Sequence, residues 1–244
     1  MNTLGLIGGT GLDNWGDAES IVVAETPYGV ASAELQVYCY AGIRILFLAR
    51  HGHTHRIPPH RVNYRANCWA MKEMAVDHLL GVNAVGAIRA GIRESDLLIP
   101  DQIIDYTWGR KHTISDSGDV PLIHADFEFP YNGELRKMLV TAAASAGVHI
   151  HDSGTHGVAQ GPRFESAAEV SRMQRDGCDV VGMTAMPEVG IARELGLDFA
   201  GLCVISNIAS GLSDEPVNHQ DILVVLKTAM DNARKLIRAV LDTF

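Results

Sequence analysis

Short apolar runs alternate along the chain with longer segments in which apolar residues recur every three or four positions. The short runs are typical of buried strands, and the longer segments are typical of helices with one apolar face. The predicted strands cover residues 4–7, 34–40, 43–49, 78–82, 97–99, 102–106, 155–159, 179–183 and 199–206. The predicted helices cover residues 62–75, 134–146, 165–175, 187–195 and 218–241. This alternation predicts an α/β protein with a mixed, largely parallel central sheet, flanked by helices on both faces.

The pattern continues without a break from one end of the chain to the other. No linker rich in Ser, Gly or Pro divides it, and no internal repeat is present. A length of 244 residues suits one large α/β domain or two small ones, and 47% hydrophobic residues are enough for a substantial core. We therefore expect a single domain over residues 1–244.

The charge and cysteine content narrow the class of protein. Twenty Lys and Arg against 29 Asp and Glu give 20 − 29 = −9, so nothing suggests general binding to nucleic acid or anionic membranes. The four cysteines have no metal-binding spacing and indicate reduced, buried thiols. The N-terminus lacks the pattern of a signal peptide, and no apolar stretch approaches the roughly 20 residues of a membrane span. These features predict a cytoplasmic protein.

A glycine-rich turn follows the first predicted strand. In parallel sheets ligands bind beyond the carboxyl ends of the strands, where Gly8-Gly9-Thr10-Gly11 lies. Glycines let backbone N–H groups approach a phosphate, and Thr10 adds a hydroxyl donor. The turn is neither a dinucleotide-binding fingerprint, because position 13 is Asp13, nor a P-loop. Taken alone, a tight turn without a ligand is the favoured interpretation.

Arg50 and His51 follow another predicted strand, and His53 and His55 come directly after them. The planar, charged fork of Arg50 suits a phosphate. Histidines at every second position also allow a metal-dependent hydrolase. We favour an anion site, because the sequence offers no carboxylate nearby and Arg50 would repel a cation.

Polar residues also follow later strands. Gly161–Glu165 is a turn in which Phe164 and Glu165 could face a flat heterocycle, although Glu165 fits a favourable first helical turn equally well. Thr184 either caps a helix or holds an anion at its N-terminus. Ser206 and Asn207 lie at the end of the most apolar predicted strand. This polar pair forms either a buried turn or a contact to a ligand.

In order and spacing, these segments resemble the trimeric purine nucleoside phosphorylase and methylthioadenosine phosphorylase superfamily. The resemblance runs from residue 4 to about residue 207 and includes several further stretches. The matching segments are Ile7–Gly11, Leu48–Gly52, Val62–Asn67, Asn83–Gly86, Asp101–Asp105, Gly161–Glu165, Gly182–Glu188 and Ser206–Asn207.

The resemblance implies a nucleoside phosphorylase fold, a homotrimer, and a reaction in which inorganic phosphate attacks the anomeric carbon while a purine leaves. It implies no metal and no organic cofactor, since phosphate is a co-substrate. It also implies a phosphate site formed by Thr10, Arg50, His51, Ala84 (through its backbone) and Thr184. By the same resemblance Met183 packs against the sugar, Phe164 faces the base, and His124 reaches the site of a neighbouring subunit.

Two residues predict which purine is used. The adenine-specific branch carries Asp and Ser where this chain has Asn207 and Glu165, whereas the inosine/guanosine branch carries Asn and Glu. An amide at Asn207 can accept from N7–H and donate to a 6-oxo group, and a carboxylate at Glu165 can accept from N1–H. Adenine has no N1 proton and carries a 6-amino donor. These two residues therefore predict a 6-oxopurine.

The residues expected near the 5′ end of the sugar predict a second preference, for the substituent at that position. The inosine/guanosine branch places a histidine for the 5′-hydroxyl near the start of the last helix, where this chain has Ile222, with Leu223 and Val225 nearby. An apolar wall there suits a methylthio group. His219, about one turn away, keeps the ordinary 5′-hydroxyl open.

These arguments predict phosphorolysis of a 6-oxopurine nucleoside that carries a 5′-methylthio group. The alternatives are an inosine/guanosine phosphorylase, a methylthioadenosine phosphorylase, a metal-dependent hydrolase using His51, His53 and His55, and a nucleoside-binding protein without turnover.

Overall fold

The computed structural model describes residues 3–12, 14–118, 120–213 and 217–244. Within these residues eleven strands form one sheet, and six of its ten strand pairings are parallel. The strands are β1 (Thr3–Gly8), β2 (Ser20–Val22), β3 (Leu35–Tyr40), β4 (Ile43–Ala49), β5 (His78–Ala87), β6 (Leu97–Leu98), β7 (Gln102–Asp105), β8 (Ile150–His151), β9 (Thr155–Val158), β10 (Val180–Gly182) and β11 (Asp198–Ile208). The helices are α1 (Tyr64–Glu73), α2 (Glu134–Ala146), α3 (Ala167–Asp176), α4 (Ala185–Glu194) and α5 (His219–Leu241).

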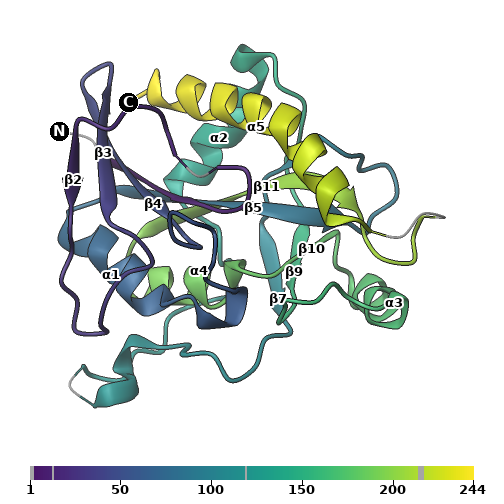
Figure 1. Cartoon of the computed structure of the whole chain (residues 1–244), viewed down its shortest axis with the longest axis horizontal. Coiled ribbons are helices and arrows are strands. Elements are labelled where there is room, and N and C mark those ends of the chain that lie inside the picture. The colour runs from purple at the N-terminus through teal and green to yellow at the C-terminus, as the bar shows by residue number, and fades with distance from the viewer. Residues whose placement is uncertain (1–2, 13, 119, 214–216) are drawn as a thin grey trace.

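Helices cover both faces of this sheet (Figure 1). Side chains alternate along a strand, so Leu4 and Leu6 of β1 belong to the core under α2 and α5, whereas Ile7 belongs to the core under α1 and α4. The residues of β4 divide in the same way, with Phe47 on the α5 side and Leu48 on the α1 side. The predicted mixed, largely parallel sheet with helices on both faces is therefore confirmed.

The ends of the helices follow from local chemistry. The α2 helix ends at Gly147, whose φ of +60° is a conformation that glycine adopts without strain. The α3 helix begins with a capping box, in which Ser166 and Glu169 each bond the backbone N–H of the other. The predicted limits of these helices hold to within two residues.

The β5 strand exchanges one of its neighbours along its length. Its first half pairs with β1 up to the Ile7–Gly81 pair, and its last residues pair with β10 from Gly86 onward. On its other edge it pairs with β11 throughout. Residues between Gly81 and Gly86 therefore face a gap in the sheet, which is a topological switch point where ligands bind in open sheets.

Two strands are longer than the apolar runs predict. The β5 strand continues past Asn83 to Ala87, and β11 continues past Asn207 to Ile208. A buried polar residue breaks the apolar run but not the ladder of backbone hydrogen bonds, so the prediction ended both strands too early. The short strands β2 and β8 were not predicted at all. No helix in the described part of the chain is long and apolar enough to cross a membrane.

Candidate active site

A cavity of about 370 Å³ opens at the gap beside β5. Its volume lies in the range of about 300–1,000 Å³ that is usual for small-molecule sites. Ten of the twelve site residues predicted from the sequence line this cavity. They are Thr10, Arg50, His51, Ala84, Phe164, Glu165, Met183, Thr184, Asn207 and Ile222.

Arg50 lies at the floor of the cavity and is fully buried. Its guanidinium donates to both carboxylate oxygens of Glu188, at 2.8 and 2.7 Å, and to the carbonyl oxygens of Val82 and Ile7, at 2.9 and 3.3 Å. Burial alone would lower the pKa of Arg50, but Glu188 outweighs it and holds the pKa above its usual value. Four of the five N–H donors of the guanidinium are thus engaged within the protein.

The remaining donor of Arg50 belongs to Nη1, which faces the glycine turn. A Cβ on Gly9 would lie 2.8 Å from this Nη1, so the close approach requires glycine. The sequence predicted that the planar guanidinium of Arg50 binds phosphate. In the structure this planar edge donates to Glu188 instead, and a single N–H is left for a ligand. The Arg50–Glu188 pair lies against Ile7 of β1 and against Gly81 and Val82 of β5.

Thr10 and two histidines line the same end of the cavity. The backbone N–H of Leu12 donates to Gly9, which closes the glycine turn, and Thr10 Oγ1 lies 3.3 Å from His55 Nε2. The rings of His55 and His51 lie 4.6 Å apart. His51 Nδ1 donates to the Ile57 carbonyl at 2.7 Å, which fixes its tautomer and leaves Nε2 as the other functional nitrogen.

Thr184 does not cap the helix that it precedes, because its side chain makes no capping hydrogen bond. Instead, its hydroxyl oxygen accepts from the amide of Asn83 at 2.8 Å, with both side chains buried. This bond joins the middle of β5 to the second residue after β10, and Ala84 is the next residue along β5 after Asn83. Thr184 and Ala84 therefore lie together on either side of the gap.

Asn207 lies at the opposite end of the cavity, where the pairing of β11 with β5 shifts register between Ile205 and Asn207. Its Oδ1 accepts from the Ser206 hydroxyl at 2.8 Å, and its Nδ2 donates to the Ile208 carbonyl at 2.8 Å. An amide offers two acceptor positions and two N–H donors, so one of each remains for a ligand.

Glu165 and Phe164 belong to the turn before α3. Burial raises the pKa of Glu165 above its usual value. Phe164 is 40% exposed, and Met183 lies between this turn and Thr184. A flat ring can thus contact Phe164 while its edge meets Glu165 and Asn207.

The C-terminal helix contributes Ile222, which is buried and lines the cavity. Val225, one turn further along α5, is half-buried, and His124 is exposed. Neither residue is among the described residues that line the cavity. The side chain of His219 lies outside the described part of the structure. Ile222 is therefore the residue of α5 that this chain places at the cavity.

Two charged residues that support the site were not singled out by the sequence. Arg110 is buried and donates to the carbonyl oxygens of Gln160, Met183 and Met186, at 2.7, 2.9 and 2.5 Å. Glu188 balances Arg50. Arg110 comes from a loop without periodicity, and Glu188 reads as an ordinary acidic residue in a first helical turn.

Only two of the three histidines of the hydrolase hypothesis come together in the structure, since His51 and His55 line the cavity and His53 does not. His53 pairs with Glu34 at 3.1 Å, while His55 turns toward Thr10. Where the chain is described, three donors close enough for a metal ion are found at Asp96, His149 and His151. These residues are absent from the cavity lining.

The sequence and the fold match a known class of enzymes. The sequence profile of the Phosphorylase superfamily matches residues 3–242, so the chain belongs to that superfamily. It is 42% identical over 244 residues to a probable S-methyl-5′-thioinosine phosphorylase of Pseudomonas syringae pv. tomato, covering 99% of each chain. It is 41% identical to a probable 6-oxopurine nucleoside phosphorylase of Dictyoglomus turgidum, covering 98% of this chain and 90% of that protein.

A solved structure has the same fold. Methylthioadenosine phosphorylase from Schistosoma mansoni in complex with adenine superposes with a TM-score of 0.95, at 28% identity, over 100% of this chain and 92% of that one. Together with the relatives in sequence, this structure supports purine nucleoside phosphorolysis as the activity of the superfamily members that this chain resembles.

Proposed function

We propose that this protein catalyses the phosphorolysis of S-methyl-5′-thioinosine to hypoxanthine and 5-methylthioribose 1-phosphate. The observation that carries the proposal is the composition of one cavity. A cationic and hydroxyl-rich end lies opposite the Asn207 amide and the Glu165 carboxyl, with the apolar side chain of Ile222 also in the wall.

Phosphate is held at the first end. The free N–H of Arg50, the hydroxyl groups of Thr10 and Thr184, and the backbone at Ala84 supply donors there, while His51 Nε2, the acceptor nitrogen of this tautomer, accepts the proton of a hydrogenphosphate oxygen. A phosphate oxygen forms a bond to the anomeric carbon as the bond from that carbon to N9 of the purine breaks. The bound anion stabilises the positive charge that develops on the sugar, so no covalent enzyme intermediate and no cofactor are needed.

The purine is recognised at the second end. The electron pair of the broken bond stays on the purine, which takes a proton at N7 from water. Asn207 Oδ1 has a lone pair left to accept from this N7–H, and Nδ2 has an N–H left for the 6-oxo group. Glu165 accepts from N1–H while it is ionised. Adenine would leave both groups mismatched, which costs roughly 1–3 kcal/mol for each buried polar group.

The 5′ substituent contacts the apolar wall. Burying a methylthio group against Ile222 contributes on the order of 1–2 kcal/mol over a solvated hydroxyl, at about 0.8 kcal/mol for each methylene-sized unit. Methylthioinosine should therefore exceed inosine by roughly 5- to 30-fold in kcat/KM.

The working form of the enzyme is a homotrimer in the cytoplasm. Three large apolar side chains, those of Trp108, Leu122 and Phe129, are more than half exposed on the segment that carries His124. An exposed apolar surface of this kind supports a contact with a neighbouring subunit, in which His124 covers that subunit's cavity. Light scattering should give the mass of three chains, and a fully active monomer would contradict this arrangement. The four free cysteines agree with a reducing compartment.

One assay tests the function directly. Release of purine is measured from methylthioinosine, methylthioadenosine and inosine, with and without phosphate. Methylthioinosine should be cleaved best, and only when phosphate is present. Equal use of inosine would indicate an inosine/guanosine phosphorylase, and preference for methylthioadenosine would contradict the roles of Asn207 and Glu165. Phosphate-independent cleavage would exclude phosphorolysis.

A further inference from the structure

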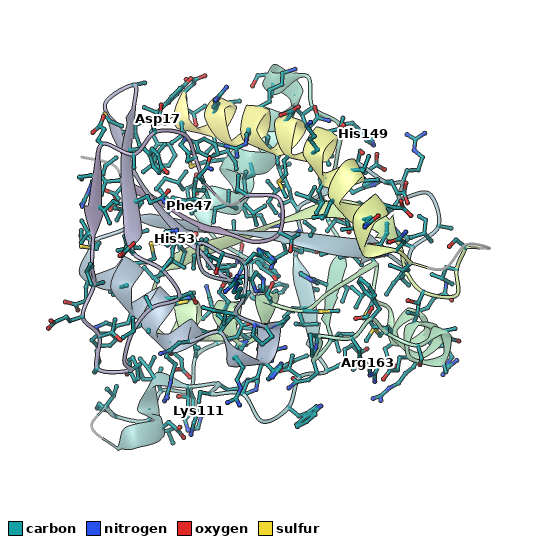
Figure 2. All side chains as sticks on the ribbon, viewed as in Figure 1. Asp17, Phe47, His53, Lys111, His149 and Arg163 are labelled. Atoms are coloured by element: carbon teal, nitrogen blue, oxygen red, sulfur yellow. The ribbon has the colours of Figure 1, made fainter. Side chains whose placement is uncertain are left out.

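A cluster of side chains that could hold a metal ion lies outside the cavity, next to strands β6 and β8 of the sheet. Asp96, His149 and His151 each present one donor atom, and these atoms lie within 4.8 Å of one another. Figure 2 shows His149 well separated from His53, which lies on the loop that carries His51 and His55. The two groups of histidines are therefore distinct.

The backbone fixes two of the three donors. His149 immediately precedes β8 and His151 ends it, so both histidines lie on one short segment of the chain. The Ile99 N–H donates to the His151 carbonyl at 2.9 Å, which holds His151 opposite Leu98. The two imidazole rings lie 5.3 Å apart.

The carboxylate comes from the turn before β6. Asp96 Oδ2 accepts from the backbone N–H of Arg93 at 2.9 Å and from His151 Nε2 at 3.0 Å. Asp96 and His151 are largely buried, whereas His149 is exposed and can turn its ring without disturbing the core. Donor atoms around a tetrahedral ion with bonds of about 2.0 Å lie about 3.3 Å apart, so the Asp96–His151 separation fits once the ion replaces the proton of His151 Nε2, which is released to water.

We propose that Asp96, His149 and His151 bind one divalent cation of the zinc, cobalt and nickel class. Two imidazoles and one carboxylate suit these ions, whereas calcium and magnesium prefer sites made of oxygen atoms. Water completes the coordination on the exposed side. The ion takes no part in phosphorolysis, so this proposal does not depend on the proposed function.

The position of this site gives the ion a structural effect. The Ile205 N–H donates to the Asp96 carbonyl at 3.0 Å, and the Ser95 N–H donates to the Ile205 carbonyl at 2.9 Å. Ile205 is the last residue of β11 before the change of register that presents Asn207. A cation that ties Asp96 to β8 therefore braces the turn that is bonded to this part of β11.

Cobalt(II) is the probe for the test, because its visible absorption reports the ligands around it. Titration of the full-length protein should show one ion bound per chain, and His149→Ala should weaken the affinity at least tenfold. His112→Ala is the matched control, since His112 is another exposed histidine near a carboxylate, 3.7 Å from Asp105. Cobalt should also raise the Tm of the wild type and of His112→Ala, but not that of His149→Ala.

Two further variants locate the ion. Asp96→Asn should weaken cobalt binding as His149→Ala does, and His51→Ala should leave it unchanged. Binding that survives His149→Ala but is lost in His51→Ala would place the ion in the cavity and overturn the proposal. Wild-type protein that shows no saturable binding, or binding that none of the variants alters, would overturn it as well.

Discussion

Replacing Asn207 with aspartate should shift the enzyme away from 6-oxopurines and toward adenine. In the wild type, Nδ2 of Asn207 donates to the Ile208 carbonyl at 2.8 Å, while Oδ1 accepts from Ser206. An aspartate places an oxygen where Nδ2 was, against that carbonyl oxygen, so the new carboxyl is favoured in its protonated form. The N–H that served the 6-oxo group is then lost, and an acceptor for a 6-amino group takes its place.

The size of the shift follows from these contacts. A mismatched polar group costs roughly 1–3 kcal/mol, and Asn207→Asp adds one mismatch for hypoxanthine and removes one for adenine. Because Asn207 is only half-buried, the lower end of the range applies to each. The sum of about 2 kcal/mol corresponds to roughly a 30-fold change in the ratio of kcat/KM values.

The assay compares methylthioinosine with methylthioadenosine at saturating phosphate. Asn207→Asp should narrow or reverse the wild-type preference, and Glu165→Ser, added to it, should narrow it further, though not additively, since both residues contact one ring. Asn232→Asp, an exposed residue of α5, is the control for the added charge. A ratio that stays within a factor of about three of the wild type in Asn207→Asp would refute the reasoning.

Three further predictions concern groups near the cavity. Because burial raises the pKa of Glu165, kcat/KM for methylthioinosine should fall as the pH drops through that pKa, and Glu165→Gln should remove this acid limb. Burial lowers the pKa of His156 to about 3, so the unfolded chain gains a proton below pH 6.5 that the folded chain does not. Stability should fall by about 1.4 kcal/mol per pH unit from that side chain, and denaturant unfolding of His156→Leu at pH 7 and 5 should lack this contribution. Arg110→Lys should lower stability by about 3 kcal/mol and kcat by about a hundredfold, since three carbonyl groups around Met183 lose their donor; unchanged kcat would contradict its positioning role.

Much of the fold can be read from the sequence because its signals are local. Helix α2 was predicted at 134–146 from its periodicity and from Gly147, and the structure has the same limits. The sequence also predicted that most of the site residues lie together, because the carboxyl ends of the strands of a largely parallel sheet meet at one edge. The structure places these residues in one cavity. Their roles stay predictions until the substrate assay is done.

The contacts that support the site are not local, and the sequence did not show them. Nothing around Glu188 indicates that it faces Arg50, because the two residues come from different halves of the chain. Arg110 lies in a loop whose residues follow no period, so its hydrogen bonds to three strand and helix ends had no signal in the pattern. The length of β5 was missed for a related reason, since Asn83 is polar but its backbone stays in the sheet.

The pairing of Arg50 with Glu188 has a consequence for how the chain is made. The two residues are 138 positions apart, so a ribosome that has released Arg50, Thr10 and His51 must still add α4 before the guanidinium gains its counter-charge. A truncated chain that stops before Glu188 would carry most of the residues that we propose to bind phosphate, around an uncompensated buried cation. Phosphate affinity should therefore appear only late in synthesis. Phosphate would then stabilise complete chains but not incomplete ones, which remain exposed to cellular quality control.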